Sequence, residues 1–166
     1  KKMAAKSASF VAASSQFLSR ANSAPLNIDD SSCTIEFWFK SPRTNSGIIM
    51  AKDDESDGRN YSFYFDHTTG KFGVQFAGNA ESYNSTALTA DTWYHIALTC
   101  NGSTGQYYLN GATDGTGSFA AWTPGTGPTT LGSRSYSGGE GFITCELSNV
   151  RIWNVVRTVT EIANNR

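Results

Sequence analysis

Hydrophobic and polar residues alternate along much of this chain, which is the pattern of strands that bury one face. The clearest case is residues 33–40, whose isoleucine and two phenylalanines fall on one side while polar or mixed residues fall on the other. Two further alternating stretches, 61–66 and 71–77, flank a short polar segment at 67–70 that ends in glycine. Side chains of a strand point alternately to its two faces, and a four-residue loop with glycine is typical of a hairpin. The pattern therefore predicts antiparallel sheets.

The same signals recur before and after this region. Residues 93–100 and 106–110 predict a second hairpin, and 10–11 and 17–18 predict two short strands near the start of the chain. The segment 112–128 is rich in Gly, Thr and Pro, and we expect it to be a long connection without strands. Counted along the chain, these signals predict roughly ten to twelve strands.

A strand followed by a short helix is predicted at the end of the chain. Leu147, Val150 and Ile152 supply apolar and β-branched packing. Thr158 is followed three residues later by Glu161, which is the reciprocal capping pair that begins a helix. We therefore expect one C-terminal helix after the last strand.

Composition supports an all-β fold and excludes some classes of partner. The 166 residues fit one domain, taken as 1–166, and the low charged fraction of 16% with 16 glycines suits short strands joined by tight turns. The net charge is −1 and the basic residues are scattered, so no surface for a phosphate backbone is indicated. No apolar run is long enough to cross a bilayer. We expect a soluble domain with no nucleic-acid partner and no membrane insertion.

Short motifs follow one another in a characteristic order along nearly the whole chain. They lie at 16–19, 34–39, 93–97, 107–111, 131–132 and 149–154. This order resembles the laminin-G-like and pentraxin-like domains of the concanavalin A-like lectin and glucanase superfold. The resemblance implies an all-β jelly-roll sandwich of two antiparallel sheets, one of them concave, to which the residues above add a short C-terminal helix.

The resemblance to the pentraxin branch of that family also has implications for a calcium site and for the cysteines. Of the calcium ligands of pentraxins only Asn60 is present, so that metal site is not implied here. The pentraxin cysteines correspond to Glu36 and Ala97, and the same strand register would place Cys33 opposite Cys100. One disulfide with a free thiol and three buried, reduced cysteines both remain open.

An acidic segment allows two further interpretations, a calcium loop or a pair of catalytic carboxylates. Asp53, Glu55 and Asp57 alternate and are followed by Gly58, as in the first half of a calcium loop, but the glutamate expected twelfth is replaced by Tyr64. Glucanases of the superfold also carry alternating carboxylates, on a strand. These residues lack interleaved apolar positions, so we expect them in a turn. We therefore expect no cofactor and no catalytic residue, with calcium at the three acidic residues as the alternative.

A glycan-binding surface would need aromatic faces to cover sugar C–H groups, together with amides or charges to bond pairs of hydroxyls. The outward-facing residues that fit are, on the predicted concave sheet, Tyr64, Gln75 and Tyr108 and, on nearby loops, Trp122, Arg134 and Tyr136.

The functional hypothesis is therefore a non-catalytic binding or adhesion module on an extracellular or virion surface. It would recognise glycans, or a protein of a cell surface or virion, through the concave face and its loops. The alternative is a structural decoration or oligomerisation domain of a phage capsid, tail fibre or cell-surface protein, in which the chain forms a homo-oligomer.

Overall fold

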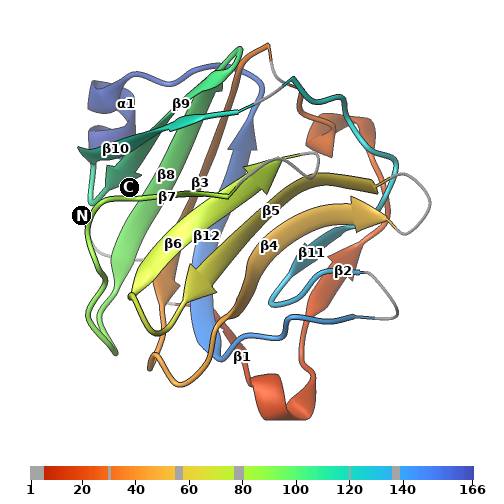
Figure 1. The fold of residues 1–166 in the computed structure, drawn as a ribbon, viewed down its shortest axis with the longest axis vertical. Helices are drawn as coiled ribbons and strands as arrows, with labels where there is room; N and C mark the ends of the chain where they lie inside the picture. Colours follow the sequence, from red (N-terminus) through yellow and green to blue (C-terminus); the bar gives the residue numbers. More distant parts are fainter. Residues whose placement is uncertain (1–5, 30, 55–57, 77–80, 120, 136–138) are drawn as a thin grey trace.

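Two six-stranded antiparallel sheets pack face to face in this computed structural model, which describes residues 6–166 except 30, 55–57, 77–80, 120 and 136–138. Sheet A contains, in spatial order, β1 (Ala8–Phe10), β12 (Cys145–Trp153), β3 (Cys33–Lys40), β8 (Tyr94–Asn101), β9 (Thr104–Leu109) and β10 (Ala112–Ser118). Sheet B contains β2 (Leu18–Arg20), β11 (Thr129–Leu131), β4 (Gly47–Asp54), β5 (Gly58–Asp66), β6 (Lys71–Phe76) and β7 (Ser82–Tyr83). Two 3-10 turns, η1 (Ala12–Ser14) and η2 (Ala24–Leu26), and the helix α1 (Val159–Asn165) complete the described elements. Sheet B lies in front of sheet A in Figure 1, and the predicted jelly-roll sandwich is confirmed.

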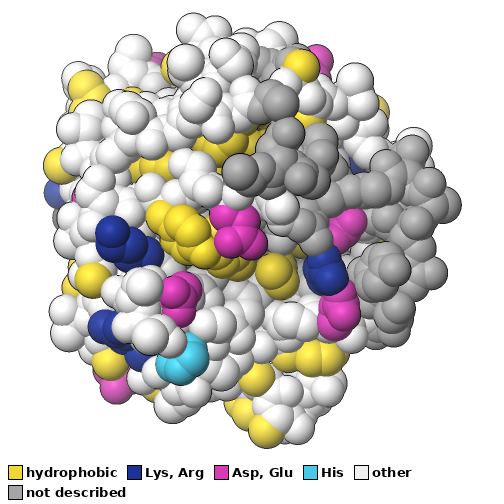
Figure 2. All heavy atoms as spheres, in the orientation of Figure 1, with side chains coloured by type: hydrophobic (Ala, Val, Ile, Leu, Met, Phe, Trp, Pro, Cys, Tyr) yellow, Lys and Arg dark blue, Asp and Glu magenta, His cyan; other side chains and the backbone are white. Residues whose placement is uncertain are grey.

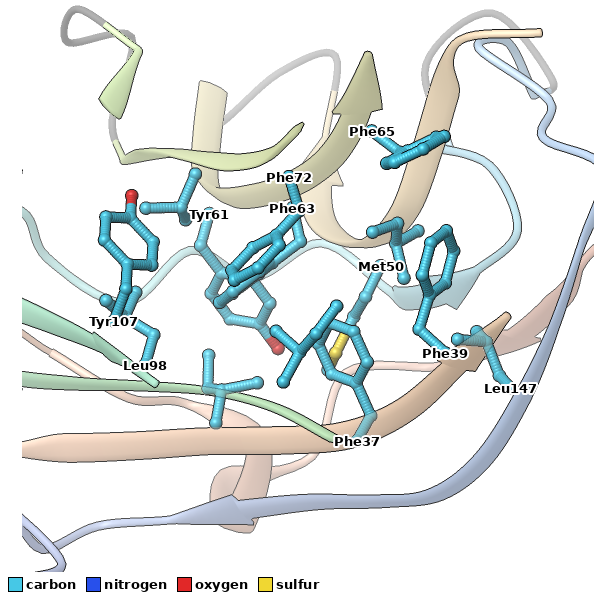
Figure 3. Close-up of a cluster of buried hydrophobic side chains, with 14 of the residues drawn as sticks. Phe37, Phe39, Met50, Tyr61, Phe63, Phe65, Phe72, Leu98, Tyr107 and Leu147 are labelled. Atoms are coloured by element: carbon cyan, nitrogen blue, oxygen red, sulfur yellow. The ribbon is translucent and has the colours of Figure 1, made fainter. Parts of the chain in front are cut away.

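An aromatic core fills the space between the sheets. Phe37 and Phe39 of β3 point across the sandwich at Phe63 and Phe65 of β5, as Figure 3 shows. The ring centroids are 5.7 Å apart in the Phe37–Phe63 pair and 5.2 Å apart in the Phe39–Phe65 pair. All four side chains are buried, so the inward face predicted from the alternation of 33–40 and 61–66 is confirmed.

The pairing of β3 with β8 has the register that the pentraxin resemblance implied. Glu36 lies opposite Ala97, and Cys33 lies opposite Cys100. These two cysteines and Cys145 are buried and unbonded. A hydrogen bond with the Cys33 thiol and burial both raise the pKa of Cys100, so this thiol is protonated at neutral pH.

The segment 112–128 corrects one expectation, because its first part is a strand rather than a connection. Residues Ala112–Ser118 form β10, which pairs with β9 at the edge of sheet A. The register shifts between Thr113 and Thr116, and Asp114 within this shift is buried. Glycine, threonine and aspartate at this edge obscure the alternation that identified the other strands.

A buried carboxylate anchors the end of the chain to the outer face of sheet A. Glu36 of β3 is fully buried. Its Oε1 accepts hydrogen bonds from Arg157 Nη1 at 2.6 Å, from Trp153 Nε1 at 3.0 Å and from Arg151 Nη1 at 3.3 Å. His95 Nε2 lies 3.4 Å from Glu36 Oε2. Burial by itself would raise the pKa of Glu36, but the hydrogen bonds from His95 and Trp153 and the charge of Arg157 lower it overall.

The helix α1 follows this anchor and begins as predicted. The Thr158 hydroxyl accepts from the Glu161 backbone N–H, and the Glu161 side chain accepts from the Thr158 N–H. Ile162 then packs against Ala97 and Tyr108, so α1 covers part of the outer face of sheet A. No helix within the described ranges is long and apolar enough to span a membrane.

Oxidation of the folded protein is expected to join Cys33 to Cys100, because the register places them directly opposite each other. The bond would close a long loop and raise the free energy of unfolding by up to about 4 kcal/mol. Peptide mapping by mass spectrometry would identify the bond, and thermal melting would measure its effect. A Cys145→Ser variant should form the same bond, whereas three free thiols after prolonged oxidation would contradict the prediction.

Substitution Glu36→Gln is expected to cost about 3 kcal/mol of stability at neutral pH, because it leaves Arg157 buried without its counter-charge. The pKa of Glu36 is lower in the folded than in the unfolded chain. Its stabilisation is therefore present above the unfolded pKa of about 4.3 and is lost as the pH falls through the folded value. Denaturant titrations should show that the difference in free energy of unfolding between wild type and variant becomes smaller from about pH 7 to about pH 3. A difference of equal size at the two pH values would refute the role of Glu36 as the counter-charge of Arg157.

Candidate functional site

A row of short side chains crosses the outer face of sheet B. Gln75 of β6, Ser62 of β5, Ala51 of β4 and Thr130 of β11 are successive cross-strand partners. Neighbouring residues of these strands, such as Phe63, fill the core, so the alternation turns this row outward. Ser62, Ala51 and Thr130 are at most 2% exposed, so within this row only Gln75 reaches the surface.

A pair of aromatic side chains lies beside this row. Tyr64 lies two residues along β5 from Ser62 and is half-buried. Its ring packs edge-on against Tyr83 of β7, with ring centroids 5.1 Å apart and an interplanar angle of 89°. Tyr83 is 39% exposed, and its hydroxyl donates to Glu81 Oε2 at 3.0 Å. Burial raises the pKa of Tyr64, so its hydroxyl remains protonated at neutral pH.

Gly73 of β6 makes room for this pair. It lies opposite Tyr64 in the ladder, and a Cβ atom added to it would lie 2.6 Å from the Tyr64 hydroxyl oxygen and 2.8 Å from the Ser82 carbonyl oxygen. The end of the Tyr64 ring can therefore lie against β6 only because this position has no side chain.

Charged residues gather near the end of β4. Asp53, which we expected in a turn, belongs to β4, and its carboxylate is almost fully buried. Arg134 Nη1 lies 3.8 Å from Asp53 Oδ2, and Arg134 also forms an ion pair with Glu140. Glu55 and Asp57 lie outside the described residues. Among the residues that are described, no three His, Cys, Asp or Glu side chains are grouped to hold a metal ion, and calcium at the acidic segment stays a prediction.

Two of the residues expected on this face lie elsewhere. Tyr108 belongs to β9 of sheet A, where α1 leaves it 7% exposed, so placing it on the same sheet as Tyr64 was wrong. Trp122 is 2% exposed and stacks on Phe76 in the core, with ring centroids 4.0 Å apart, so its predicted exposure on a loop was also wrong. Tyr136 lies outside the described residues.

The face that remains is built from Tyr64, Gln75 and the half-exposed Arg134, together with Tyr83, which was not among the residues predicted from the sequence. A strand of two residues shows no alternation, so nothing in the pattern indicated that Tyr83 joins sheet B. Figure 2 views this side of the molecule, on which hydrophobic side chains form a central band with acidic and basic side chains around it.

Substitution Gly73→Ala is expected to displace the Tyr64 ring and to lower stability by about 1–3 kcal/mol, because the new methyl group overlaps the Tyr64 hydroxyl. Thermal or denaturant unfolding measures the cost. In a Tyr64→Ala background the same change should cost less, since most of the overlap is gone and only the Ser82 carbonyl remains close. Equal costs in both backgrounds would show that Gly73 does not accommodate Tyr64.

Solved structures with the same arrangement come from several classes of protein. A native heptameric SAP-like pentraxin from Limulus polyphemus is 17% identical, with a TM-score of 0.68 over 89% of this chain and 79% of the pentraxin. A candidate carbohydrate-binding protein from Bacteroides ovatus is 20% identical, with a TM-score of 0.67 over 95% of this chain and 46% of that protein. The binding domain of botulinum neurotoxin serotype G is 10% identical, with a TM-score of 0.73 over 99% of this chain and 45% of the toxin domain. The present chain thus spans less than half the length of the last two.

Sequence comparison supports the same relationship at the level of the family. No curated protein sequence matches this chain. A laminin G family model described as concanavalin A-like lectin/glucanases superfamily matches residues 14–163, nearly the whole chain. Together with the two packed antiparallel sheets, this match shows that the chain belongs to the concanavalin A-like lectin and glucanase superfamily.

Proposed function

We propose that this domain is a non-catalytic module that binds glycans through the outer face of sheet B. The observation that carries the proposal is the Tyr64–Tyr83 pair standing beside Gln75 on adjoining strands. Sugar rings present C–H groups that pack on aromatic surfaces, and they present hydroxyls that bond amides and charged groups. Both kinds of contact are offered on this face within neighbouring strands.

Each residue has a distinct part in this proposal. Tyr83 is the more exposed of the two rings and supplies the surface on which a sugar packs. Tyr64 holds that ring edge-on, while its own hydroxyl oxygen is buried. The Gln75 amide combines donor and acceptor atoms that suit a pair of neighbouring hydroxyls. Arg134, already held by two carboxylates, lines the opposite end of the face as a fixed donor.

The carboxylates of this face support binding rather than hydrolysis. A retaining glycosidase needs a nucleophile and a separate acid about 5 Å apart, one ionised and one protonated. Asp53 and Glu140 instead both pair with Arg134, so each carboxylate already has a partner within the protein. The similarity to proteins described as carbohydrate-binding or as a toxin binding domain agrees with a binding role, and an extracellular or virion surface is the location that suits it.

A glycan array followed by affinity measurement on the strongest ligand tests the proposal. Tyr83→Ala and Gln75→Ala should each weaken binding by about fivefold, since each removes one contact worth roughly 1 kcal/mol. Val159→Ala is the matched control, because Val159 is 46% exposed on α1, which covers the other sheet.

The absence of binding to every glycan on the array would refute glycan recognition. If the protein then proved to be a stable oligomer by sizing, the structural or oligomerisation role would be favoured instead. Release of reducing sugar that disappears in Asp53→Asn would contradict the non-catalytic part of the proposal.

A further inference from the structure

An open trough with a volume of about 600 Å³ lies on the outer face of sheet A, across β8, β9 and β10. Its floor consists of two rows of cross-strand partners on these three strands. The first row is Thr99, Gln106 and Thr116, and the second is Asn101, Thr104 and Ser118. The next row on this face is covered by α1 through Ile162, so the trough begins where the cover of the helix ends.

Several polar groups of this floor have no partner in the protein. Thr116 and Ser118 are exposed, whereas Thr99 is 4% exposed at the bottom of the trough. Within the described ranges, the hydroxyls of these three residues make no hydrogen bond to the chain. The Thr99 hydroxyl is open to the solvent of the trough, so a ligand group that bonds it replaces solvent and breaks no hydrogen bond within the protein.

Gln106 is held in place between the two rows. Its Nε2 donates to the Gly115 carbonyl oxygen at 2.6 Å and to the Tyr107 carbonyl oxygen at 3.0 Å. Both amide hydrogens are thereby used, and the side-chain carbonyl oxygen is left as an oriented acceptor. Because this geometry exists before any ligand arrives, little conformational entropy is lost when the acceptor is engaged.

The chemistry of the lining selects the class of ligand. The described side chains of the lining are hydroxyls and amides without charge or an aromatic ring, so they provide no counter-charge for an ion and no ring on which a nucleobase could stack. Side chains of directly opposite residues are spaced by about 5 Å, a distance on the scale of one sugar ring. We infer that the trough is a second glycan site, which binds an uncharged oligosaccharide through its hydroxyls.

This site is independent of the one proposed on sheet B, because the two lie on opposite outer faces of the sandwich. The residues described in the lining include no aromatic platform, so binding depends on several hydrogen bonds made together rather than on stacking. Removing one hydroxyl should therefore weaken binding moderately, and removing two should weaken it strongly.

The test is a titration of the ¹⁵N-labelled chain with malto-, cello-, manno- and chito-oligosaccharides, followed by NMR. Amide shifts are expected to cluster at Gly105, Gln106 and Thr116 with at least one of these probes. In the Thr99→Val, Thr116→Val double variant the affinity should fall at least about tenfold. Thr113→Val is the matched control, because Thr113 is exposed on the same strand but does not line the trough.

The outcomes separate the two sites. Shifts confined to β5, β6 and β7 would overturn the trough proposal and leave the proposed function standing. Shifts confined to β8, β9 and β10 would support the trough and count against the site on sheet B. No shift with any probe, or unchanged affinity in the double variant, overturns the trough proposal. Where both sites respond, Tyr83→Ala should abolish only the shifts on sheet B.

Discussion

The packing of phenylalanines between the sheets is the constraint on which the other features depend. Phe37 and Phe39 meet Phe63 and Phe65 across the sandwich, and each is fixed by its position in a strand. Because side chains alternate with a period of two, settling which residues face inward also settles which face outward. The packing of the core therefore determines which residues lie on both candidate binding surfaces. A shift of one residue in the register of β5, for example, would bury Tyr64 and expose Phe63 and Phe65.

The regular strands could be predicted from the sequence because hydrophobic and polar residues alternate strongly along them. β3 begins and ends where the pattern places it, and the register of β3 with β8 follows from the family resemblance. Alternation shows the face of a strand but not the sheet to which the strand belongs. Tyr108 was therefore expected beside Tyr64, although sheet A carries it under α1. The sheet assignment depends on contacts between residues distant in sequence, which a local pattern does not contain.

The misplacement of Trp122 and the missed β10 have a different cause. Both lie in a stretch rich in glycine, threonine and proline, where composition favours loops. The structure uses part of this stretch as an edge strand and uses the tryptophan to fill the space next to Phe76. A large aromatic residue in such a segment is driven inward by its apolar area whatever its local surroundings.

The short sheet edges have a consequence for how this domain can be used. The edge strands of sheet B are β2 and β7, of three and two residues, and β1 at one edge of sheet A has three. The longer edge, β10, is interrupted by a register shift. Edges of this kind give a neighbouring copy little backbone to pair with. Many copies could therefore be displayed side by side at high density, or repeated in tandem, without fusing into a continuous cross-β aggregate.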